Sequence, residues 1–397
     1  MLRDITPSAV YMGALAAFVG YAASFAIVLA GLTSIGADQG ETATGLFAAT
    51  LAMGICSIVV PAATRIPAAI AWSTPGAAFL AATQTLPGGF AEAVGALIGC
   101  ALLIVVTGLV PPLARIVGSI PRQIASALLA GVILKLCFAP ALAFGTNPFA
   151  ALLLVAAWIG GLAWHRLAAM PLTVIAFLLV LFVTTDMPAS SGASGSVILP
   201  PLEAVMPVIS LQGFVSVSIP LYLVTMAGQN IPGFALLELK GYAIRRPRLI
   251  RDTGLASLVI SPFGGIPVNM SAITAAMMSG EDAGADPSKR YWAAIASGVI
   301  YVALAFAAGP VVALVNLAPM ELIMAVAGLA LIPALAASLA GMAGAGTPGQ
   351  AGQIDVPAAL TFVVTASGMS LFGLSGAFWG LVTGSLVWAL TRLRTGS

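Results

Sequence analysis

Long apolar runs separated by short polar connections dominate the sequence from about residue 9 onward. A helix needs about 20 apolar residues to cross the hydrocarbon of a bilayer, so such runs are typical of transmembrane helices. The first run is too long for a signal-peptide core, and we interpret it as the first span. We predict 14 spans, with 12 or 13 as the alternative, because the ninth is weak and the third and tenth are short. The predicted ranges are 9–32, 42–60, 68–84, 91–113, 121–139, 148–165, 171–185, 214–237, 252–264, 266–280, 290–316, 320–343, 354–374 and 376–391.

The composition supports an all-α polytopic membrane protein that contacts the lipid bilayer. Hydrophobic residues make up 60% of the chain and charged residues only 7%. Soluble domains carry about 25% charged residues. So few charges cannot cover a soluble protein of 397 residues, which excludes a cytosolic enzyme and a disordered regulator. The net charge of +2 gives no pull toward nucleic acid, so no nucleic-acid partner is expected.

The basic residues predict the topology. If both termini lie in the cytoplasm, 14 of the 15 Lys and Arg residues fall on the cytoplasmic side, which is a strong positive-inside signal. The exception is Lys135, near the outer end of the span 121–139. The residues on the predicted cytoplasmic side are Arg3, Arg65, Arg115, Arg122, Arg166, Lys240, Arg245, Arg246, Arg248, Arg251, Lys289, Arg290, Arg392 and Arg394.

The chain divides into two halves with the same number of predicted spans. The longest stretch without a clear span, 186–212, contains the midpoint, with seven spans before it and seven after it. Because seven is odd, the second half enters the membrane from the opposite face. This pattern predicts a seven-plus-seven inverted repeat, an architecture of secondary transporters.

The third span of each half is short and interrupted, at 68–84 and 266–280, as expected for a binding site between inverted repeats. Each begins with an extended apolar stretch and continues as a small-residue helix of about 12 residues, long enough for roughly half the bilayer core. Ser73 or Thr74 is a good helix N-cap before Pro75, and Asn269 is a good N-cap after Pro267. Two half-helices starting near the membrane midplane would bring free N–H groups together, which suits an anion. The alternative is a pair of ordinary proline kinks.

The first span of each half adds polar groups at membrane depth. Tyr21 and Ser24 lie in the span 9–32, and Gln229 and Asn230 lie in the span 214–237. Such groups are costly in lipid unless they face protein, water or a substrate. Helix-to-helix hydrogen bonding is the alternative role. The candidate substrate-binding residues are therefore Tyr21, Ser24, Ser73, Thr74, Gly76, Gln229, Asn230, Asn269, Met270 and Ser271, and an aromatic slot from Phe18, Tyr21, Phe79 and Phe234 is a further expectation.

These segments carry a family resemblance over essentially the whole chain. The sequences WSTPG (72–76), AGQNIPG (227–233) and FGGIPVN (263–269) resemble the benzoate:proton symporter family, often called BenE. The chain is more distantly similar to uracil/xanthine permeases and to sulfate- and bicarbonate-type anion transporters. The resemblance implies a core domain (1–118 and 213–317, spans 1–4 and 8–11) that moves like an elevator against a gate domain (119–212 and 318–397). It also implies a possible homodimer through the gate domains.

One departure from the distant relatives bears on the substrate. Nucleobase permeases carry acidic residues in spans eight and ten, whereas the matching positions here are Gln229 and about Val268–Asn269. A buried carboxylate would repel an anion, while amide and helix N–H groups donate to it. The same change leaves the proton route open. Either an acid near a span end, each of which we expect to be solvated, carries the proton, or the bound substrate does; these acids are Glu92, Glu238, Asp252, Glu321 and Asp355.

The leading hypothesis is a transporter of the bacterial inner membrane that imports benzoate or a similar aromatic carboxylate with protons. The alternatives are transport of another small anion or a nucleobase, and a passive anion channel on the same fold. A membrane enzyme lacks support, because the sequence has one histidine, three widely spaced cysteines and no nucleophile–base pair. We expect no catalytic residue, metal site or cofactor.

Overall fold

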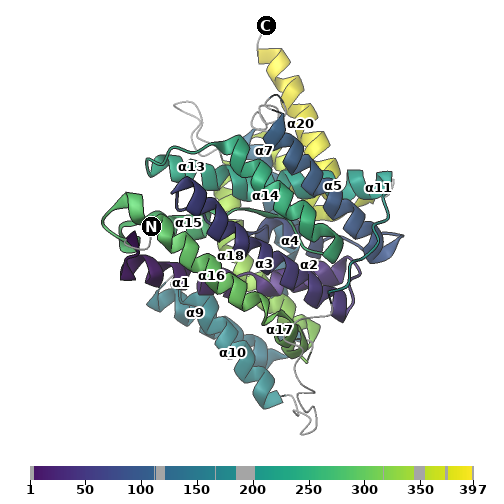
Figure 1. Ribbon diagram of the computed structural model, residues 1–397. Helices are drawn as coiled ribbons and strands as arrows, with labels where there is room; N and C mark the ends of the chain where they lie inside the picture. Colours follow the sequence, from purple (N-terminus) through teal and green to yellow (C-terminus); the bar gives the residue numbers. More distant parts are fainter. Residues whose placement is uncertain are drawn as a thin grey trace.

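The computed structural model describes residues 4–110, 112, 121–165, 167–184, 202–315, 317–343, 354–371 and 374–395, and it is mainly helical (Figure 1). The first half contains α1 (Pro7–Ala22), α2 (Phe25–Ser34), α3 (Gln39–Thr64), β1 (Ile70–Trp72), α4 (Thr74–Ala81), α5 (Gly89–Leu109), α7 (Arg122–Cys137), α8 (Ala139–Leu142), η2 (Ala143–Gly145), α9 (Pro148–Trp164) and α10 (Ala169–Thr184).

The second half has the same alternation of long helices and short breaks. It contains α11 (Leu211–Gly213), η3 (Phe214–Ser218), α12 (Ile219–Thr225), η4 (Met226–Asn230), α13 (Ile231–Leu239), α14 (Arg246–Ile260), η5 (Ser261–Phe263), β2 (Val268–Met270), α15 (Ala272–Ser279), η6 (Glu281–Ala283), η7 (Pro287–Lys289), α16 (Tyr291–Ala305), α17 (Ala308–Val315), α18 (Met320–Met342), α19 (Val356–Ser367), β3 (Ser370–Leu371), β4 (Leu374–Ser375) and α20 (Gly376–Thr395).

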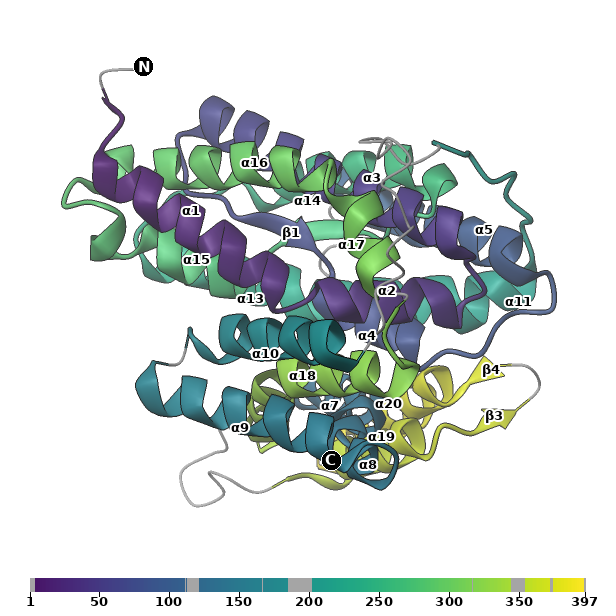
Figure 2. The same cartoon turned by 90° about the horizontal axis from the view of Figure 1, so that it is seen from below.

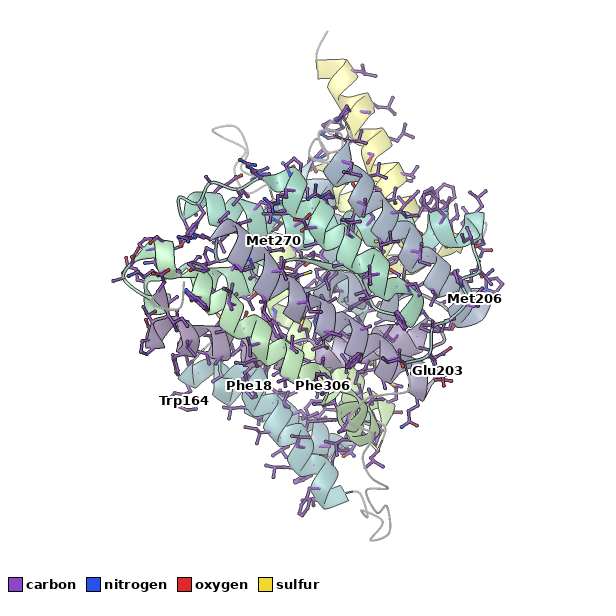
Figure 3. The ribbon with its side chains drawn as sticks, in the orientation of Figure 1. Phe18, Trp164, Glu203, Met206, Met270 and Phe306 are labelled. Carbon is purple, nitrogen blue, oxygen red and sulfur yellow. The ribbon has the colours of Figure 1, made fainter. Side chains whose placement is uncertain are left out.

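Each of the 14 predicted ranges overlaps a helix of the structure. Among the described residues, six helices are long and apolar enough to cross a membrane, or seven if the pair Pro287–Ala305 and Ala308–Val315, bent by 60°, forms one span. The structure therefore establishes a polytopic helical protein, and the count of 14 crossings stays a prediction. Large apolar side chains on the outside, such as Phe18 and Trp164 in Figure 3, are 54% and 78% exposed, as expected of a lipid-facing surface.

The predicted span 214–237 contains two π-helical turns. The turn η3 ends two residues before Pro220, and η4 ends two residues before Pro232. A proline has no N–H to donate within the helix, and its ring crowds the carbonyl four residues earlier. A wider π turn relieves this crowding, and such turns occur frequently at functional sites.

The helices form two layers (Figure 2). One layer contains α1, α3, α5, α14 and α16 with the strands β1 and β2 among them, and the other contains α7, α9, α10, α18, α19 and α20. In the first layer α3 packs on α16 and α5 packs on α14, so each pair joins the two halves of the chain. Glycines allow both pairs to approach closely: a Cβ on Gly298 would lie 2.7 Å from the Gly54 oxygen, and one on Gly254 would lie 2.8 Å from the Val105 nitrogen.

Two short antiparallel strands lie at the centre of this layer, where β1 pairs with β2 in the register Ile70 to Met270, Ala71 to Asn269 and Trp72 to Val268. Serine hydroxyls of two neighbouring helices form hydrogen bonds with further backbone groups of the strands. Ser57 of α3 donates to the Ile70 oxygen at 3.1 Å, and the hydroxyl of Ser257 in α14 accepts from the Val268 nitrogen at 2.9 Å. The two broken segments therefore depend on each other and on one serine from each half.

One end of the first layer, which we call the basic end, carries Arg245 and Arg246 at the start of α14. At the basic end, Tyr242 donates to the Pro287 oxygen at 3.1 Å, and Gly284 lies beside Thr6 and Ser8 of the N-terminal region. Ser288 donates from its hydroxyl and its amide to Asp286, which lowers the pKa of that carboxyl. At the opposite end, residues 202–210 form a segment that we call the strap, and we call this end the strap end. The Val208 nitrogen donates to the Ala91 oxygen, and the Val205 nitrogen donates to the Pro262 oxygen.

Replacing Gly298 by alanine should destabilise the fold, because the added methyl group meets the Gly54 carbonyl at an impossible distance. Overpacking of this kind costs about 1–3 kcal/mol. We expect a lower thermal unfolding temperature of the detergent-solubilised protein. Gly160→Ala in α9 is the matched control, because nothing lies within 4 Å of its added Cβ. Equal unfolding temperatures for both variants would contradict the close packing of α3 on α16.

Candidate functional site

The start of α4 confirms the first predicted cap. Ser73 is the N-cap residue, and its fully buried hydroxyl accepts from the Gly76 nitrogen at 3.0 Å and shares a hydrogen bond of 2.8 Å with Thr225 of α12. Since Pro75 has no N–H and Gly76 is already bonded, Thr74 keeps the one free N–H of this first turn. The helix has eight residues rather than the predicted 12, because it ends at Ala81 with Ala82 as its C-cap.

The start of α15 differs from the prediction. Asn269 is the central residue of β2, opposite Ala71, and Ser271 occupies the N-cap position without a side-chain bond to the helix. The prediction of Asn269 as the cap is therefore wrong, and this helix also has eight residues. Because no side chain caps α15, the N–H groups of its first turn have no side-chain partner at the N-cap position.

A π-helical turn links the starts of both half-helices. In η4, Gly228 lies against the ring of Pro75 and near Leu129 of α7. Two residues later, Asn230 accepts from the Met270 nitrogen at 3.0 Å and donates to the Met226 sulfur at 3.1 Å. Asn230 therefore has a structural role here, which was the alternative interpretation of this residue.

Gln229 lies between these two contacts. Its side chain is 8% exposed, and its amide makes no hydrogen bond to any described residue. The turn thus holds an unpaired amide between Gly228, which touches the start of α4, and Asn230, which binds β2. Unlike the Tyr21 hydroxyl, the Gln229 amide is not among the fully buried unpartnered atoms, so it keeps a small accessible surface at which a ligand or water could bind.

An aromatic group covers the Trp72 side of the crossing strands. The Trp72 Nε1 donates to the Ser24 hydroxyl at 2.7 Å, and Ser24 donates to the Gly20 oxygen at the break between α1 and α2. The Tyr21 ring lies 5.2 Å from the Trp72 ring, and the buried Tyr21 hydroxyl has no hydrogen-bond partner among the described residues. Tyr21 and Ser24 are therefore close to β1, and their role in substrate binding stays a prediction.

The structure does not bring Asn269 to this group. Side chains alternate across a strand, and directly paired residues share a face, so Asn269 lies with Ala71 on the face opposite Trp72 and Met270. Its side chain is fully buried, and neither amide atom has a partner in the described part of the chain. Of the proposed aromatic slot, Phe79 and Phe234 are buried, whereas Phe18 is exposed on the outer surface of α1 (Figure 3).

Sequence reasoning missed three residues that shape this site. Thr225 was visible as a polar residue in the span 214–237, but nothing in the sequence indicates its bond to Ser73. Ser57 and Ser257 were also missed, although each occupies the second predicted span region of its half beside a broken third span. Serines recurring at matching places in the two halves are the signal that would have found them.

One of the acids near the span ends differs from its prediction. Glu92 is 5% exposed, where a solvated charge was expected. It accepts a short hydrogen bond from the Ser210 hydroxyl of the strap and one of 2.7 Å from the Gly88 nitrogen. The strap buries it. Glu321 and Asp355 are exposed, as expected.

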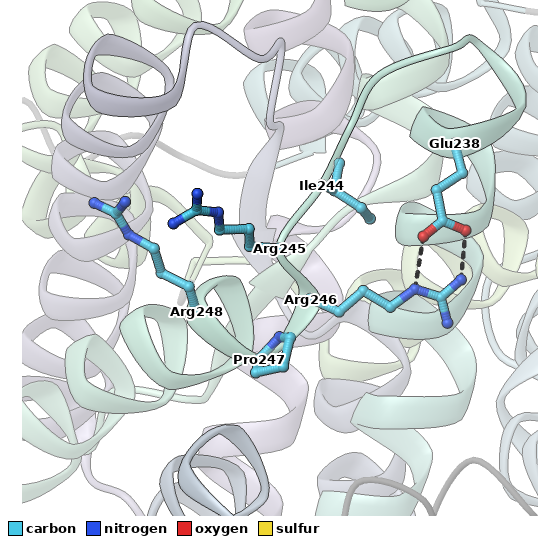
Figure 4. Close-up of a pocket in the computed structure, with 6 residues that line it drawn as sticks. All are labelled: Glu238, Ile244, Arg245, Arg246, Pro247 and Arg248. Carbon is cyan, nitrogen blue, oxygen red and sulfur yellow. Dashed lines mark hydrogen bonds and ion pairs between the residues drawn. The ribbon is translucent and has the colours of Figure 1, made fainter. Parts of the chain in front are cut away.

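One cavity lies away from the crossing strands, at the basic end. It has a volume of about 540 Å³ and is lined by Glu238 and residues 244–248 (Figure 4). Arg246 binds Glu238 through two hydrogen bonds, and Arg248 lies 3.6 Å from Asp252. These charges lie on the connection between α13 and α14, and no candidate site residue lines the cavity. The described residues contain no group of His, Cys, Asp and Glu able to hold a metal ion.

Comparisons with known proteins agree with the architecture. A model of the family described as benzoate membrane transport protein matches residues 3–390. The chain is 33% identical to the inner membrane protein YdcO of Escherichia coli (strain K12), covering 99% of this chain and 98% of that protein. It is 30% identical to the benzoate membrane transport protein of Acinetobacter baylyi, covering 97% and 95%.

A solved structure has the same fold. The transmembrane domain of the cyanobacterial bicarbonate transporter BicA aligns with a TM-score of 0.62 and 13% identity, over 97% of this chain and 98% of that domain. The family match covers nearly the whole chain, and both curated relatives match over nearly their full length. The chain therefore belongs to the benzoate membrane transport protein family.

Proposed function

We propose that this protein imports benzoate or a similar aromatic carboxylate together with protons across the bacterial inner membrane. The observation that carries the proposal is the unpaired Gln229 amide, held between the starts of α4 and α15. The name of the Acinetobacter baylyi relative supports the substrate class, and the BicA-like fold supports a membrane anion transporter.

The chemistry of the site suits a monocarboxylate. The Gln229 side-chain N–H and the free N–H groups of α15 donate to an anion, and hydrogen bonds to a charged group contribute about 1.5–3 kcal/mol each. None of the ten candidate residues is an acid, so no negative charge repels the ligand. The rings of Tyr21 and Trp72 offer an apolar surface for the aromatic part.

The proposed transport movement follows from the two layers. The site borders the second layer, because Leu129 of α7 reaches Gly228 and α7 also packs against α4. We assign the first layer to the core, with the boundaries 1–118 and 213–317, and the second to the gate, 119–212 and 318–397. An elevator-type movement of the core along the gate would carry the substrate across. The packing of α3 on α16 and of α5 on α14 supports the proposed seven-plus-seven repeat.

The function is tested by uptake of labelled benzoate into proteoliposomes, with and without an inward proton gradient. Because neutral benzoic acid crosses lipid by itself, protein-free liposomes are the reference. We expect saturable accumulation above this reference that the proton gradient increases. Saturable uptake that ignores the gradient would contradict proton coupling and favour a passive channel, and absence of saturable uptake would contradict benzoate as the substrate.

Changing Gln229 should impair uptake without unfolding the protein. Gln229→Ala removes one donor to the carboxylate, so we expect kcat/KM to fall about 10- to 100-fold. Gln229→Glu keeps the shape but adds a negative charge, and we expect no measurable uptake. Gln39→Glu, the same change at an exposed position, is the control and should transport normally.

Asn269→Ala is the companion variant. Because Asn269 lies on the face opposite Trp72, we expect it to retain far more uptake than Gln229→Ala. Its unfolding temperature should not fall, since its amide makes no bond that the change removes. Normal uptake by Gln229→Ala, or loss of uptake by Asn269→Ala alone, would contradict the assigned site.

The route of the proton is tested at Glu92. We propose that the proton travels with the bound carboxylate, because no site residue carries a carboxylate or imidazole and the Glu92 partners Gly88 and Ser210 lie outside the site. Glu92→Gln should therefore keep gradient-driven accumulation, as should the exposed control Glu321→Gln. Loss of gradient dependence in Glu92→Gln alone would instead identify Glu92 as the proton carrier.

A further inference from the structure

A smaller cavity lies between the two layers at the strap end. Its volume is about 140 Å³, room for about five water molecules at roughly 30 Å³ each. The core side contributes Phe79, Thr83 and Gln84, and the gate side contributes Lys135 of α7 and Thr365 of α19. Gln212 of α11, which packs on α5, also lines the cavity. The cavity therefore combines one cation and several neutral polar groups with an aromatic ring.

Lys135 gives this cavity its charge. It is the sole Lys or Arg lining the cavity, and none of the described lining residues is an acid. Its ammonium donates to the Ser367 oxygen at 3.2 Å, next to Gly368 at the end of α19. An ammonium has three N–H donors, so this bond leaves two for a ligand. It also leaves the positive charge without a counter-charge among the lining residues.

Thr365 also lines the cavity, although its fully buried hydroxyl lies against Gly380 of α20. Thr365 is 5% exposed, and its hydroxyl makes no hydrogen bond to the described residues. The buried threonine and the unneutralised lysine lie on neighbouring helices of the gate layer, since α7 packs against α19. Thr365 is buried, whereas Lys135 is exposed at the edge of the cavity, where its charge is accessible to an anion.

The cavity lies beside the proposed substrate site. Phe79 lines it and is four residues from Pro75 along α4, a distance of about 6 Å at 1.5 Å per residue. At the start of α4, Gly228 lies against Pro75 and Leu129, and none of these three residues lines the cavity. A ligand that leaves the strap end for the substrate site would therefore meet Lys135 first.

We infer that this cavity is a vestibule that captures a small monocarboxylate anion before it reaches the substrate site, with Lys135 as the counter-charge. The inference rests on the proposed function and adds a second, electrostatic binding position to it. It also gives a reason for the single basic residue that the positive-inside pattern leaves on the opposite side. A purely structural role, capping the end of α19, would require the hydrogen bond to Ser367 but no anion.

The test is the concentration dependence of benzoate uptake by three variants in proteoliposomes. We expect Lys135→Gln to raise KM about tenfold, equivalent to ~1.4 kcal/mol, with little change in kcat. Lys135→Arg keeps the charge and should stay near the wild-type KM. Lys240→Gln is the matched control, because it removes one exposed lysine at the basic end and should leave KM unchanged.

Ionic strength separates charge from structure. Salt screens the attraction between the Lys135 ammonium and the carboxylate, so the wild-type KM should rise between about 0.05 M and about 0.5 M salt. Lys135→Gln should lose this dependence. A structural cap would not produce either effect, and the unfolding temperature of each variant shows whether it is folded.

A chemical variant covers the case in which Lys135→Gln fails to fold. Lys135→Cys in a Cys137→Ser background, modified with a thiol reagent that carries an ammonium, should recover a low KM, whereas a sulfonate reagent should raise it. An unchanged KM and salt dependence in a Lys135→Gln protein that transports benzoate would overturn this inference alone. Absence of saturable benzoate uptake by the wild-type protein would overturn the proposed function, and this inference with it.

Discussion

The pairing of two broken spans at the centre of the first layer is the constraint on which the rest of the structure depends. Extended backbone inside a membrane has no water to satisfy its N–H and C=O groups, so it is tolerated only where protein supplies partners. Here β1 and β2 supply them to each other, and Ser57 and Ser257 add a hydroxyl from each half. Neither segment is viable alone, which ties the first half of the chain to the second.

The same pairing brings together the hydrogen-bond donors of the proposed carboxylate site. Because each strand leads directly into a half-helix, two helix starts lie near the strands, and one of them has no capping side chain. In the π-helical turn η4, Gly228 lies against Pro75 and Asn230 binds Met270, and Gln229 stands between these two residues in the chain. The result is a group of neutral donors without a fixed charge. Such a site favours an anion and requires no carboxylate that would repel it.

Local signals in the sequence were enough for the helices and for one cap. The Ser-Thr-Pro sequence at 73–75 predicts the start of α4, because N-cap preference and proline geometry act within one turn. The Asn269 prediction failed because its conformation depends on pairing with residues about 200 positions earlier, which no local pattern shows. Glu92 was misjudged for a similar reason. Its burial comes from the strap at 202–210, whose packing is not visible in the span pattern.

The central claim is that a carboxylate binds between η4 and the start of α15, on the Trp72 face of the crossing strands. The most direct measurement is an experimental structure with bound 4-iodobenzoate, whose heavy atom locates the ring unambiguously. The account predicts iodine density near the Tyr21 and Trp72 rings, with the carboxylate within hydrogen-bond distance of Gln229. Density on the Asn269 face, or bound ligand elsewhere with this position empty, would contradict it.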